Sequence, residues 1–316
     1  MTPVPRSGTQ YVLSSGPYEA HIASVGATLR RLTYEGRDLV VPFDADEVRP
    51  AYRGAVLAPW PNRIVDGRYA FAGQEQQVAL TEPDRGHALH GLAAWLDFAS
   101  VVAAEGDGLT LSATIEPQQG YPWRVRVETT FELGDDGLKQ SVRATNESPE
   151  AAPFGTGPHP YLVAGSAPLD EWTLSLPAAQ VLEVTDDRLV PLGLRPVEID
   201  ADRFDFREPR RLGPVEIDHA YTDLDRDADG TATVRLTDPH GTGVELSWDD
   251  RCPWVQIHTA DLPGGPAQPG HRAGLAVEPM TCAPDAYNAD RYDYDTGLLT
   301  IEPGQSVTAS WRIAAI

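Results

Sequence analysis

The sequence contains very little lysine. Its 25 basic residues are arginines with the exception of Lys139. A P-loop uses a lysine to bind phosphates, and a Schiff-base enzyme needs a lysine for its imine, so both classes are nearly excluded. The sequence also has no GxxxxGK[ST] motif and no convincing GxGxxG motif.

Cysteine is equally scarce, because Cys252 and Cys282 are the only two in 316 residues. This number is too small for a disulfide framework. Neither cysteine has further Cys or His residues close by in the sequence, so no metal site is expected on them. We expect two free, partly buried thiols.

Basic residues are too few to balance the acidic ones, and the formal net charge is −22. Nucleic acids and anionic membrane surfaces bind basic patches, so neither is an expected partner. No uninterrupted apolar run approaches the length of a membrane span. The first residues, MTPVPRSGTQ, lack the apolar core of a signal peptide. The sequence therefore predicts a cytoplasmic protein.

Helical periodicity is almost absent, and 28 glycines with 28 prolines disfavour long helices. Alternation with a period of two dominates instead. In RVRVETTFEL (124–133) the side chains from Val125 to Leu133 at every second position share one face. GLTLSATI (108–115), GVELSW (243–248) and SVTASWRI (306–313) repeat the pattern. These runs are typical of strands with one buried face.

Turn signals separate the predicted strands, as in GDDG (134–137), DADG (227–230) and DPHG (238–241). NRIVDGRYAFAGQ (62–74) predicts a hairpin that turns at Asp66-Gly67, because this pair accepts the positive φ of a tight turn. No linker or repeat divides the chain. We therefore predict one all-β domain over residues 1–316, a large antiparallel β-sandwich with little helix.

His159 lies between two prolines in TGPHPYL (156–162). Proline fixes its own φ and holds the preceding residue extended, so this histidine has little backbone freedom. A rigid backbone can aim a side chain, but the stretch alone favours a simple turn.

Glu278 is the second unusual residue, in AGLAVEPMTCAPDAYN (273–288). Residues 274–277 are typical of a buried strand that runs directly into this glutamate. A buried carboxylate is costly unless it is hydrogen-bonded or takes part in chemistry. The alternative is a glutamate that faces water at the end of a strand.

Other polar residues lie on short loops beside the predicted strands. His87 and His90 form an HxxH pair without the glutamate of HExxH, so a polar loop beside a pocket, or a surface loop, is favoured over a metal site. Asn62 and Arg63 follow a proline-rich run, and the guanidinium fork suits hydroxyl or carboxylate oxygens. Asp218 ends a predicted strand, where it either faces a site or caps a turn.

Several of these stretches occur in the order typical of one family. They are NRIVDGRYAFAGQ, HALHGL, QQGYPW, GPHPYL, IDHAY, WVQIHTADLP and LAVEPMTCAPDAYN. In these stretches, which extend over most of the chain, the sequence resembles the aldose 1-epimerases (mutarotases) of the galactose mutarotase-like superfamily.

This resemblance implies a β-supersandwich that acts on a small-molecule free sugar without a cofactor or metal. It implies that His159 is the general acid and Glu278 the general base. The positions that match sugar-hydroxyl contacts in the family are Asn62, Arg63, His90, Asp218 and Gln256.

The implied reaction removes a proton from O1 and delivers one to the ring O5, so that the ring opens, C1 turns and the ring closes on its other face. An acid and a base on opposite sides of the sugar suffice. Histidine suits the acid role because it titrates near neutral pH. We expect the site residues to line one open concave pocket with an aromatic wall from Tyr161, Trp95 or Trp123.

One departure from the family pattern concerns the sugar, and other functions on the same fold are alternatives as well. Galactose-type members carry an NHTYFN-like stretch where this chain has PHPYLV (158–163), so the resemblance does not single out galactose. A mutarotase of a phosphorylated or sulfonated sugar is one alternative, and a non-catalytic carbohydrate-binding protein on the same fold is another. A glycoside hydrolase would need a pair of carboxylates at a set separation, and a metal-dependent cupin would need clustered ligands.

Overall fold

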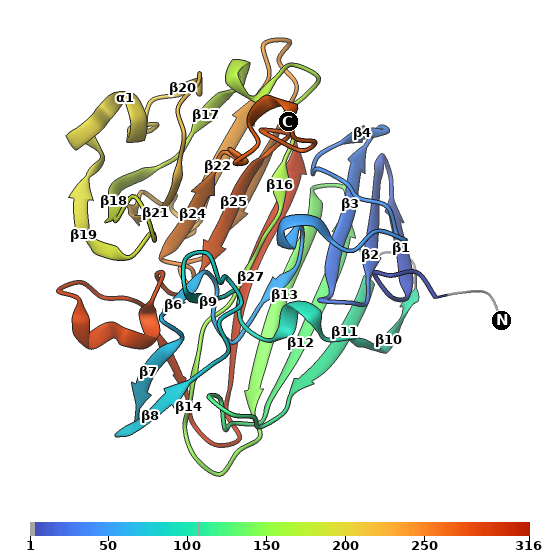
Figure 1. Ribbon diagram of the computed structural model, residues 1–316. Coiled ribbons are helices and arrows are strands. Elements are labelled where there is room, and N and C mark those ends of the chain that lie inside the picture. The colour runs from blue at the N-terminus through green and yellow to red at the C-terminus, as the bar shows by residue number, and fades with distance from the viewer. Residues whose placement is uncertain (1–3, 106–107) are drawn as a thin grey trace.

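Antiparallel β-sheets make up most of the molecule (Figure 1). The computed structural model describes residues 4–105 and 108–316. Strands account for 47% of the structure and helical turns for 8%. These values confirm the prediction of an all-β fold with little helix. None of the helices in the described ranges is long and apolar enough to cross a membrane.

The largest sheet has nine strands. Their order across the sheet is β10 (Ala99–Glu105), β11 (Gly108–Ile115), β12 (Val125–Gly134), β13 (Gly137–Asn146), β27 (Ser306–Ala315), β23 (Gly243–Trp248), β22 (Ala232–Thr237), β17 (Thr173–Ser175) and β20 (Arg210–Arg211).

Two further sheets pack with it. The six-stranded sheet has the order β16 (Tyr161–Leu162), β25 (Leu275–Met280), β24 (Trp254–His258), β21 (Asp218–Leu224), β18 (Ala178–Val184) and β19 (Pro191–Pro196). The four-stranded sheet has the order β1 (Gln10–Ser15), β2 (Tyr18–Ala23), β3 (Thr28–Tyr34) and β4 (Arg37–Asp38).

Short strand pairs and single helical turns connect these sheets. The pairs are β5 (Val56–Leu57) with β15 (Gly157–Pro158), β6 (Arg63–Val65) with β9 (His87–Leu89), β7 (Arg68–Phe71) with β8 (Gln74–Gln77), and β14 (Ala152–Phe154) with β26 (Leu299–Ile301). The helical turns are η1 (Pro50–Tyr52), η2 (Ala93–Trp95), η3 (Leu169–Glu171), η4 (Val197–Asp200), α1 (Ala201–Phe204), η5 (Gly265–Ala267) and η6 (Ala286–Arg291).

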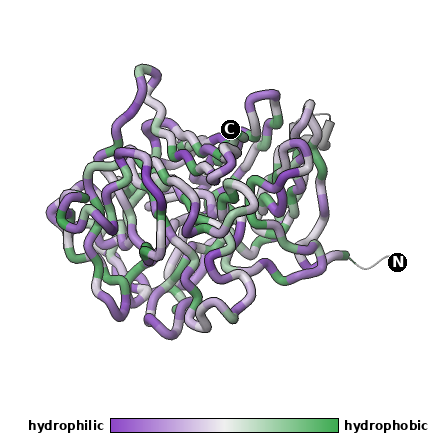
Figure 2. Tube along the Cα trace, turned by 90° about the horizontal axis from the view of Figure 1, so that it is seen from above, coloured by the Kyte–Doolittle hydropathy of each residue, from purple (hydrophilic) through white to green (hydrophobic). Residues whose placement is uncertain are grey.

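The predicted alternation is confirmed where it was strongest. On β12 the residues from Val125 to Leu133 at every second position are buried, while those between them are partly or fully exposed. The apolar side chains of this set, all except Thr129, join a core cluster that extends through all three large sheets. Figure 2 shows hydrophobic and hydrophilic residues alternating along many of these segments. Each large apolar side chain buried in this way contributes about 1.5–3 kcal/mol to stability.

The predicted hairpin at Asp66-Gly67 is wrong in its strand pairing. Both residues have positive φ, and the Gly67 amide donates to the Ile64 carbonyl, so the turn itself is present. However, β6 pairs with β9, and β7 pairs with β8. Backbone groups of β6 are bound instead by Asp285, whose amide donates to Arg63 O and whose carboxylate accepts from the Val65 amide.

Candidate active site

Three neighbouring strands of the six-stranded sheet carry the carboxylates and amide that the sequence singled out. Gln256 on β24 lies directly opposite Glu278 on β25 and opposite Ala220 on β21. Because side chains two residues apart on a strand share a face, Asp218 lies on the same face. The Gln256 amide donates to Asp218 Oδ1 over 2.6 Å.

The two faces of this sheet have different roles. Val255, Ile257 and Val277 point into the main core. The opposite face carries the polar residues together with Ala220 and Ala276, which are small and buried. Small side chains between polar ones leave room above this face for a ligand.

His159 lies beside the same face because its segment runs antiparallel to β25. Tyr161 pairs with Ala276, and the Thr281 amide donates to Thr156 O, so the register places His159 opposite Glu278. The segment lies close to β25: a Cβ at Gly157 would be 2.5 Å from Pro279 O.

His159 and Glu278 form a buried pair. Nε2 of the imidazole lies 3.5 Å from Oε1 of the carboxylate, and the side chains are 6% and 3% exposed. Nδ1 of His159 and Oε2 of Glu278 have no hydrogen-bond partner among the described residues. The two groups are therefore neighbours. The sequence analysis expected them on opposite sides of the sugar, and this expectation is wrong. Neighbouring groups suffice, because O1 and O5 are both bonded to C1.

Burial shifts the protonation of this pair in opposite directions. It lowers the pKa of His159 to about 3, and the positive field of His258 adds to the effect. It raises the pKa of Glu278 well above the ordinary value, with a further contribution from the Asp218 charge that Arg63 opposes. The expectation that this histidine titrates near neutral pH is therefore wrong, because a buried imidazole loses the hydration of its charged form.

His90 packs against His159, with ring centroids 4.9 Å apart. Its Nδ1 accepts a hydrogen bond from the Asn62 amide over 3.2 Å, and its own amide donates to Asn62 O. Asn62 and His90 both have positive φ. Burial lowers the pKa of His90 well below its ordinary value, so the ring is neutral.

The ligand-type atoms of His90, His159 and Glu278 lie within 4.8 Å of one another, as in a metal site. A histidine that binds a metal normally donates its other ring N–H to an acceptor. His90 does the reverse, because its Nδ1 accepts from the Asn62 amide and its proton therefore lies on Nε2. The donor set consequently suits a hydrogen bond from His90 to a ligand oxygen better than a metal ion.

Arg63 is fixed beside these groups by Glu82. Its Nε and Nη2 donate to the two carboxylate oxygens over 2.7 and 3.0 Å, and Nη1 donates to Asn62 Oδ1 over 3.3 Å. Burial lowers the pKa of Arg63, but Glu82 and the charges of Asp218 and Glu278 raise it overall. The charge of Arg63 is therefore retained inside the site.

Asp218 remains a carboxylate although it is close to Glu278. Burial raises its pKa, but the fields of His258 and Arg63 and the bond from Gln256 lower it overall. Of the two neighbouring acids, Asp218 is the ionised one and Glu278 is the one that can hold a proton.

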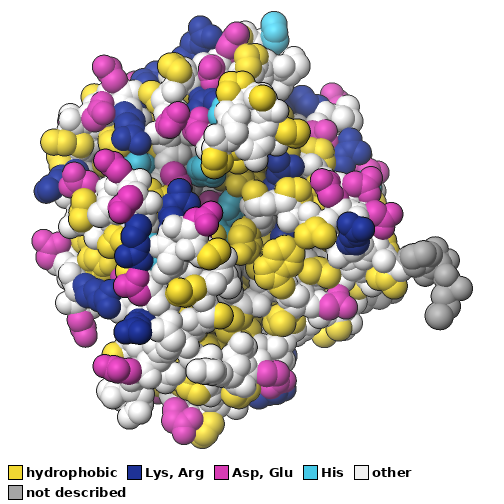
Figure 3. Space-filling model, in the orientation of Figure 1, with side chains coloured by type: hydrophobic (Ala, Val, Ile, Leu, Met, Phe, Trp, Pro, Cys, Tyr) yellow, Lys and Arg dark blue, Asp and Glu magenta, His cyan; other side chains and the backbone are white. Residues whose placement is uncertain are grey.

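The structure thus brings all of the sequence-predicted site residues together on one sheet face and its adjoining loops. They are less open than predicted, because Asn62, His90 and Gln256 are at most 6% exposed. The face of the molecule in Figure 3 shows histidine atoms gathered in a hollow near its centre. A cavity of about 220 Å³ adjoins the site and is lined in part by Asp218 and His258.

The predicted aromatic wall is only partly supported. Tyr161 stacks on His159 at a centroid distance of 5.2 Å. Trp123 packs in the core against Phe71, away from this face. Trp95 lies beside Tyr52, with ring centroids 5.9 Å apart, and the Arg49 guanidinium lies over its ring. The sequence analysis missed Tyr52, whose ring lies 4.7 Å from that of His90.

Two further residues were not found from the sequence. His258 lies on β24, 4.0 Å from Asp218. His258 is part of WVQIHTADLP and lies two residues after Gln256, a spacing that places both side chains on the same face of a strand and could have identified it. Glu82 precedes the HALHGL stretch, and nothing in the sequence links it to Arg63.

His87 is buried, but its ring nitrogens bond to backbone groups of Asp66 and Arg188.

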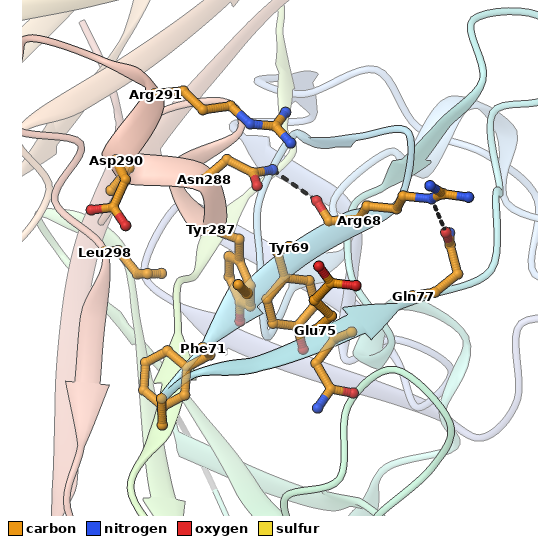
Figure 4. A pocket seen from close by; sticks show the side chains of 14 residues that line it. Arg68, Tyr69, Phe71, Glu75, Gln77, Tyr287, Asn288, Asp290, Arg291 and Leu298 are labelled. Atoms are coloured by element: carbon orange, nitrogen blue, oxygen red, sulfur yellow. Dashed lines mark hydrogen bonds between the residues drawn. The ribbon is translucent and has the colours of Figure 1, made fainter.

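A separate cavity of about 930 Å³ lies between the β7–β8 hairpin and η6 (Figure 4). Its lining includes Arg68, Phe71 and Leu298. None of the sequence-predicted site residues lines it. This cavity is therefore distinct from the candidate active site.

The fold places the chain among the galactose mutarotase-like β-sandwiches. It superposes on a GalM/aldose epimerase homologue from C. elegans with a TM-score of 0.82 at 21% identity, covering 98% of each chain. It also superposes on a galactose 1-epimerase from Lactobacillus acidophilus with a TM-score of 0.77 at 16% identity, covering 97% of this chain and 94% of that one.

Comparison of the sequence with known proteins identifies the family within this fold. The profile of the aldose 1-epimerase family matches residues 9–314. The uncharacterized protein YihR from Escherichia coli (strain K12) is 35% identical over 301 residues, which is 95% of this chain and 91% of that protein. The chain therefore belongs to the aldose 1-epimerase family.

Proposed function

We propose that this protein is an aldose 1-epimerase that interconverts the α and β anomers of a free aldose. The observation that carries the proposal is the buried pair of His159 and Glu278, 3.5 Å apart beside polar side chains. A protein that only binds sugar has no need of two buried proton carriers next to each other.

The pair supplies the two proton transfers that the reaction needs. Glu278 as carboxylate takes the O1 proton while His159 as imidazolium gives a proton to O5, the C1–O5 bond breaks and the aldehyde forms. Rotation about C1–C2 and the reverse transfers close the ring on its other face. Positioned acid and base groups each contribute on the order of 10²–10⁴-fold to such a rate.

The proton balance fits both directions of the reaction. The pair holds one exchangeable proton, either on His159 as imidazolium beside the Glu278 carboxylate or on Glu278 as carboxylic acid beside a neutral imidazole. Burial favours the second, uncharged form in the empty site. The pair titrates as a unit, and either form opens the ring with the roles of the two groups exchanged.

The other side chains would bind and orient the sugar. Arg63 and His90 donate hydrogen bonds, while Asp218 accepts them and is held in place by Gln256. Asn62 supports both donors through its backbone amide and side-chain oxygen. Tyr52 and Tyr161 present apolar surface beside the two histidines.

One observation favours an acidic sugar as a second candidate substrate. Arg53 lies with its guanidinium carbon 5.8 Å from the centroid of the Tyr161 ring. Its Nε is buried without a partner among the described residues, and its Nη1 makes a long bond of 3.4 Å to Pro42 O. A half-buried guanidinium with spare donors suits a carboxylate, sulfonate or phosphate on the sugar.

NMR exchange spectroscopy of anomers tests both candidates, with spontaneous mutarotation subtracted. The panel contains neutral aldoses and matched sugars with a 6-carboxylate, 6-sulfonate or 6-phosphate. Catalysed exchange of any member supports the epimerase, and its absence for all members contradicts it. If Arg53 binds the anionic group, Arg53→Ala raises KM about tenfold or more for the acidic sugars alone; an equal KM change for neutral sugars contradicts this role.

A further inference from the structure

Asp285 is a buried carboxylate that the proposed proton transfers do not use. It follows Glu278 on the same stretch of chain, precedes η6, and is fully buried with a positive φ of 59°. Burial raises its pKa, although bonds from Tyr292, the Val65 amide and Asn288 oppose that rise. A carboxylate buried at this cost needs a structural or functional reason.

The contacts of Asp285 converge on β6, the strand that carries Arg63 and follows Asn62. Its backbone amide donates to Arg63 O over 2.7 Å, and its Oδ1 accepts from the Val65 amide over 2.8 Å. This pair of bonds has the pattern that a neighbouring strand would make. Asp285 thus occupies the place that β7 would take in a simple hairpin.

The remaining contacts of the carboxylate fix it in this place. Asn288 donates to Oδ1 over 2.8 Å, and the Tyr292 hydroxyl donates to Oδ2 over 2.6 Å. Asn288 also donates to Arg68 O over 2.9 Å, a bond drawn in Figure 4, so the same loop binds the start of β7. Arg291 Nη1 lies 3.8 Å from Oδ2.

The other end of this stretch is tied to the acid–base pair. Glu278 lies on β25, and Thr281 is bonded through its amide and hydroxyl to Thr156, on the segment that leads to His159. Asp285 therefore joins the strand that carries Arg63 to the stretch that carries Glu278 and, through Thr281, to the separate segment that carries His159.

We propose that Asp285 is a positioning residue that sets where Asn62 and Arg63 lie relative to Glu278. This role rests on the proposed epimerase function, because it acts through residues that bind the sugar. What matters is the oxygen that accepts from the Val65 amide. An asparagine keeps this oxygen and can turn its amide toward the Tyr292 hydroxyl, so it should substitute well, whereas alanine should not.

The experiment compares Asp285→Ala, Asp285→Asn and a control, Tyr292→Phe, on the best substrate of the panel. The control removes one hydrogen bond to the same carboxylate but leaves both contacts with β6. We expect KM to rise about tenfold or more in Asp285→Ala and to stay within about threefold of wild type in the other two. Reversible unfolding raises the apparent KM only by the inverse of the folded fraction, so a tenfold rise in a variant that circular dichroism shows to be mostly folded reports positioning and not loss of stability.

A double-mutant cycle tests the route of the effect. If Asp285 acts through Arg63, Asp285→Ala should change KM much less in an Arg63→Ala background than in the wild type. Additive changes would overturn the proposal. So would an Asp285→Ala enzyme with wild-type KM and a rate reduced only by its folded fraction, or a Tyr292→Phe enzyme with an equal rise in KM.

Sugar affinity measured by calorimetry keeps this proposal separate from the proposed function. A wild-type protein that binds sugar without exchanging its anomers would contradict the epimerase. The positioning role would then be tested by Kd. We expect Kd to rise in Asp285→Ala and to stay near the wild-type value in Asp285→Asn and Tyr292→Phe. An unchanged Kd in Asp285→Ala would contradict the role.

Discussion

Replacing Glu82 by glutamine should destabilise the protein through Arg63. Glu82 accepts both prongs of the Arg63 guanidinium and a further bond from Arg85. The Arg63 and Glu82 side chains are 10% and 12% exposed, so the pair is largely shielded from water. Breaking a buried pair from one side costs about 3–5 kcal/mol. Asp218 and Glu278 offset part of the Arg63 charge that loses its partner, so we expect the free energy of unfolding to fall by about 3 kcal/mol.

For a chain of 316 residues about 3 kcal/mol lowers Tm by roughly 4–5 °C. Differential scanning calorimetry measures this, with Glu183→Gln as the matched control. Glu183 pairs with Arg195, and their side chains are 45% and 54% exposed, so its loss should cost about 1 kcal/mol or less. Equal shifts in Tm for the two variants would refute the reasoning that burial makes the Arg63 pair important.

The same pair has a predictable pH dependence. Burial raises the pKa of Glu82, but Arg63 and Arg85 lower it overall below the ordinary 4.5. A carboxylate with a lowered pKa stabilises the fold fully above its unfolded pKa and loses this contribution as the pH falls through the folded pKa. The difference in stability between wild type and Glu82→Gln should therefore be constant near neutral pH and shrink below about pH 4.5. A difference that grows on acidification contradicts the assignment.

Two further predictions concern the acid–base pair. The catalysed rate should persist at about pH 5, below the ordinary histidine pKa, because burial lowers the pKa of His159 to about 3. The rate should fall at high pH, when the pair loses its shared proton. If the NMR exchange rate instead falls on acidification with a midpoint at the ordinary histidine pKa, the assignment is contradicted. Gly157→Ala should slow exchange by roughly 10²-fold, because its Cβ would lie 2.5 Å from Pro279 O and must displace the His159 segment from β25. Gly108→Ala, where the space is open, is the control, and equal rates in both variants would show that the close approach is unimportant.

The strands were predictable where burial of one face imposes a period of two, as on β12. The hairpin at Asp66-Gly67 shows the limit of local signals. The turn residues specify the turn, but a distant carboxylate, Asp285, competes for the backbone groups that the hairpin would have used. Such a competitor has no local signature in the sequence.

The candidate site was predictable as a set of residue types but not as an arrangement. The opposition of His159 and Glu278 depends on the register between two segments far apart in the sequence. The lowered pKa of His159 depends on burial by Tyr52, Tyr161 and His90, which proline spacing does not reveal. Glu82 was missed because its role depends wholly on a contact with Arg63.

Anomer exchange by NMR in Glu278→Gln, beside wild type and His159→Asn, tests the central claim most directly. Glutamine keeps the shape of the side chain but cannot accept a proton at neutral pH. Each variant should lose roughly 10²-fold or more of the catalysed rate while sugar binding survives, and the double variant should lose less than the combined effect of the two. A Glu278→Gln enzyme with a near-normal rate on a good substrate would contradict the account.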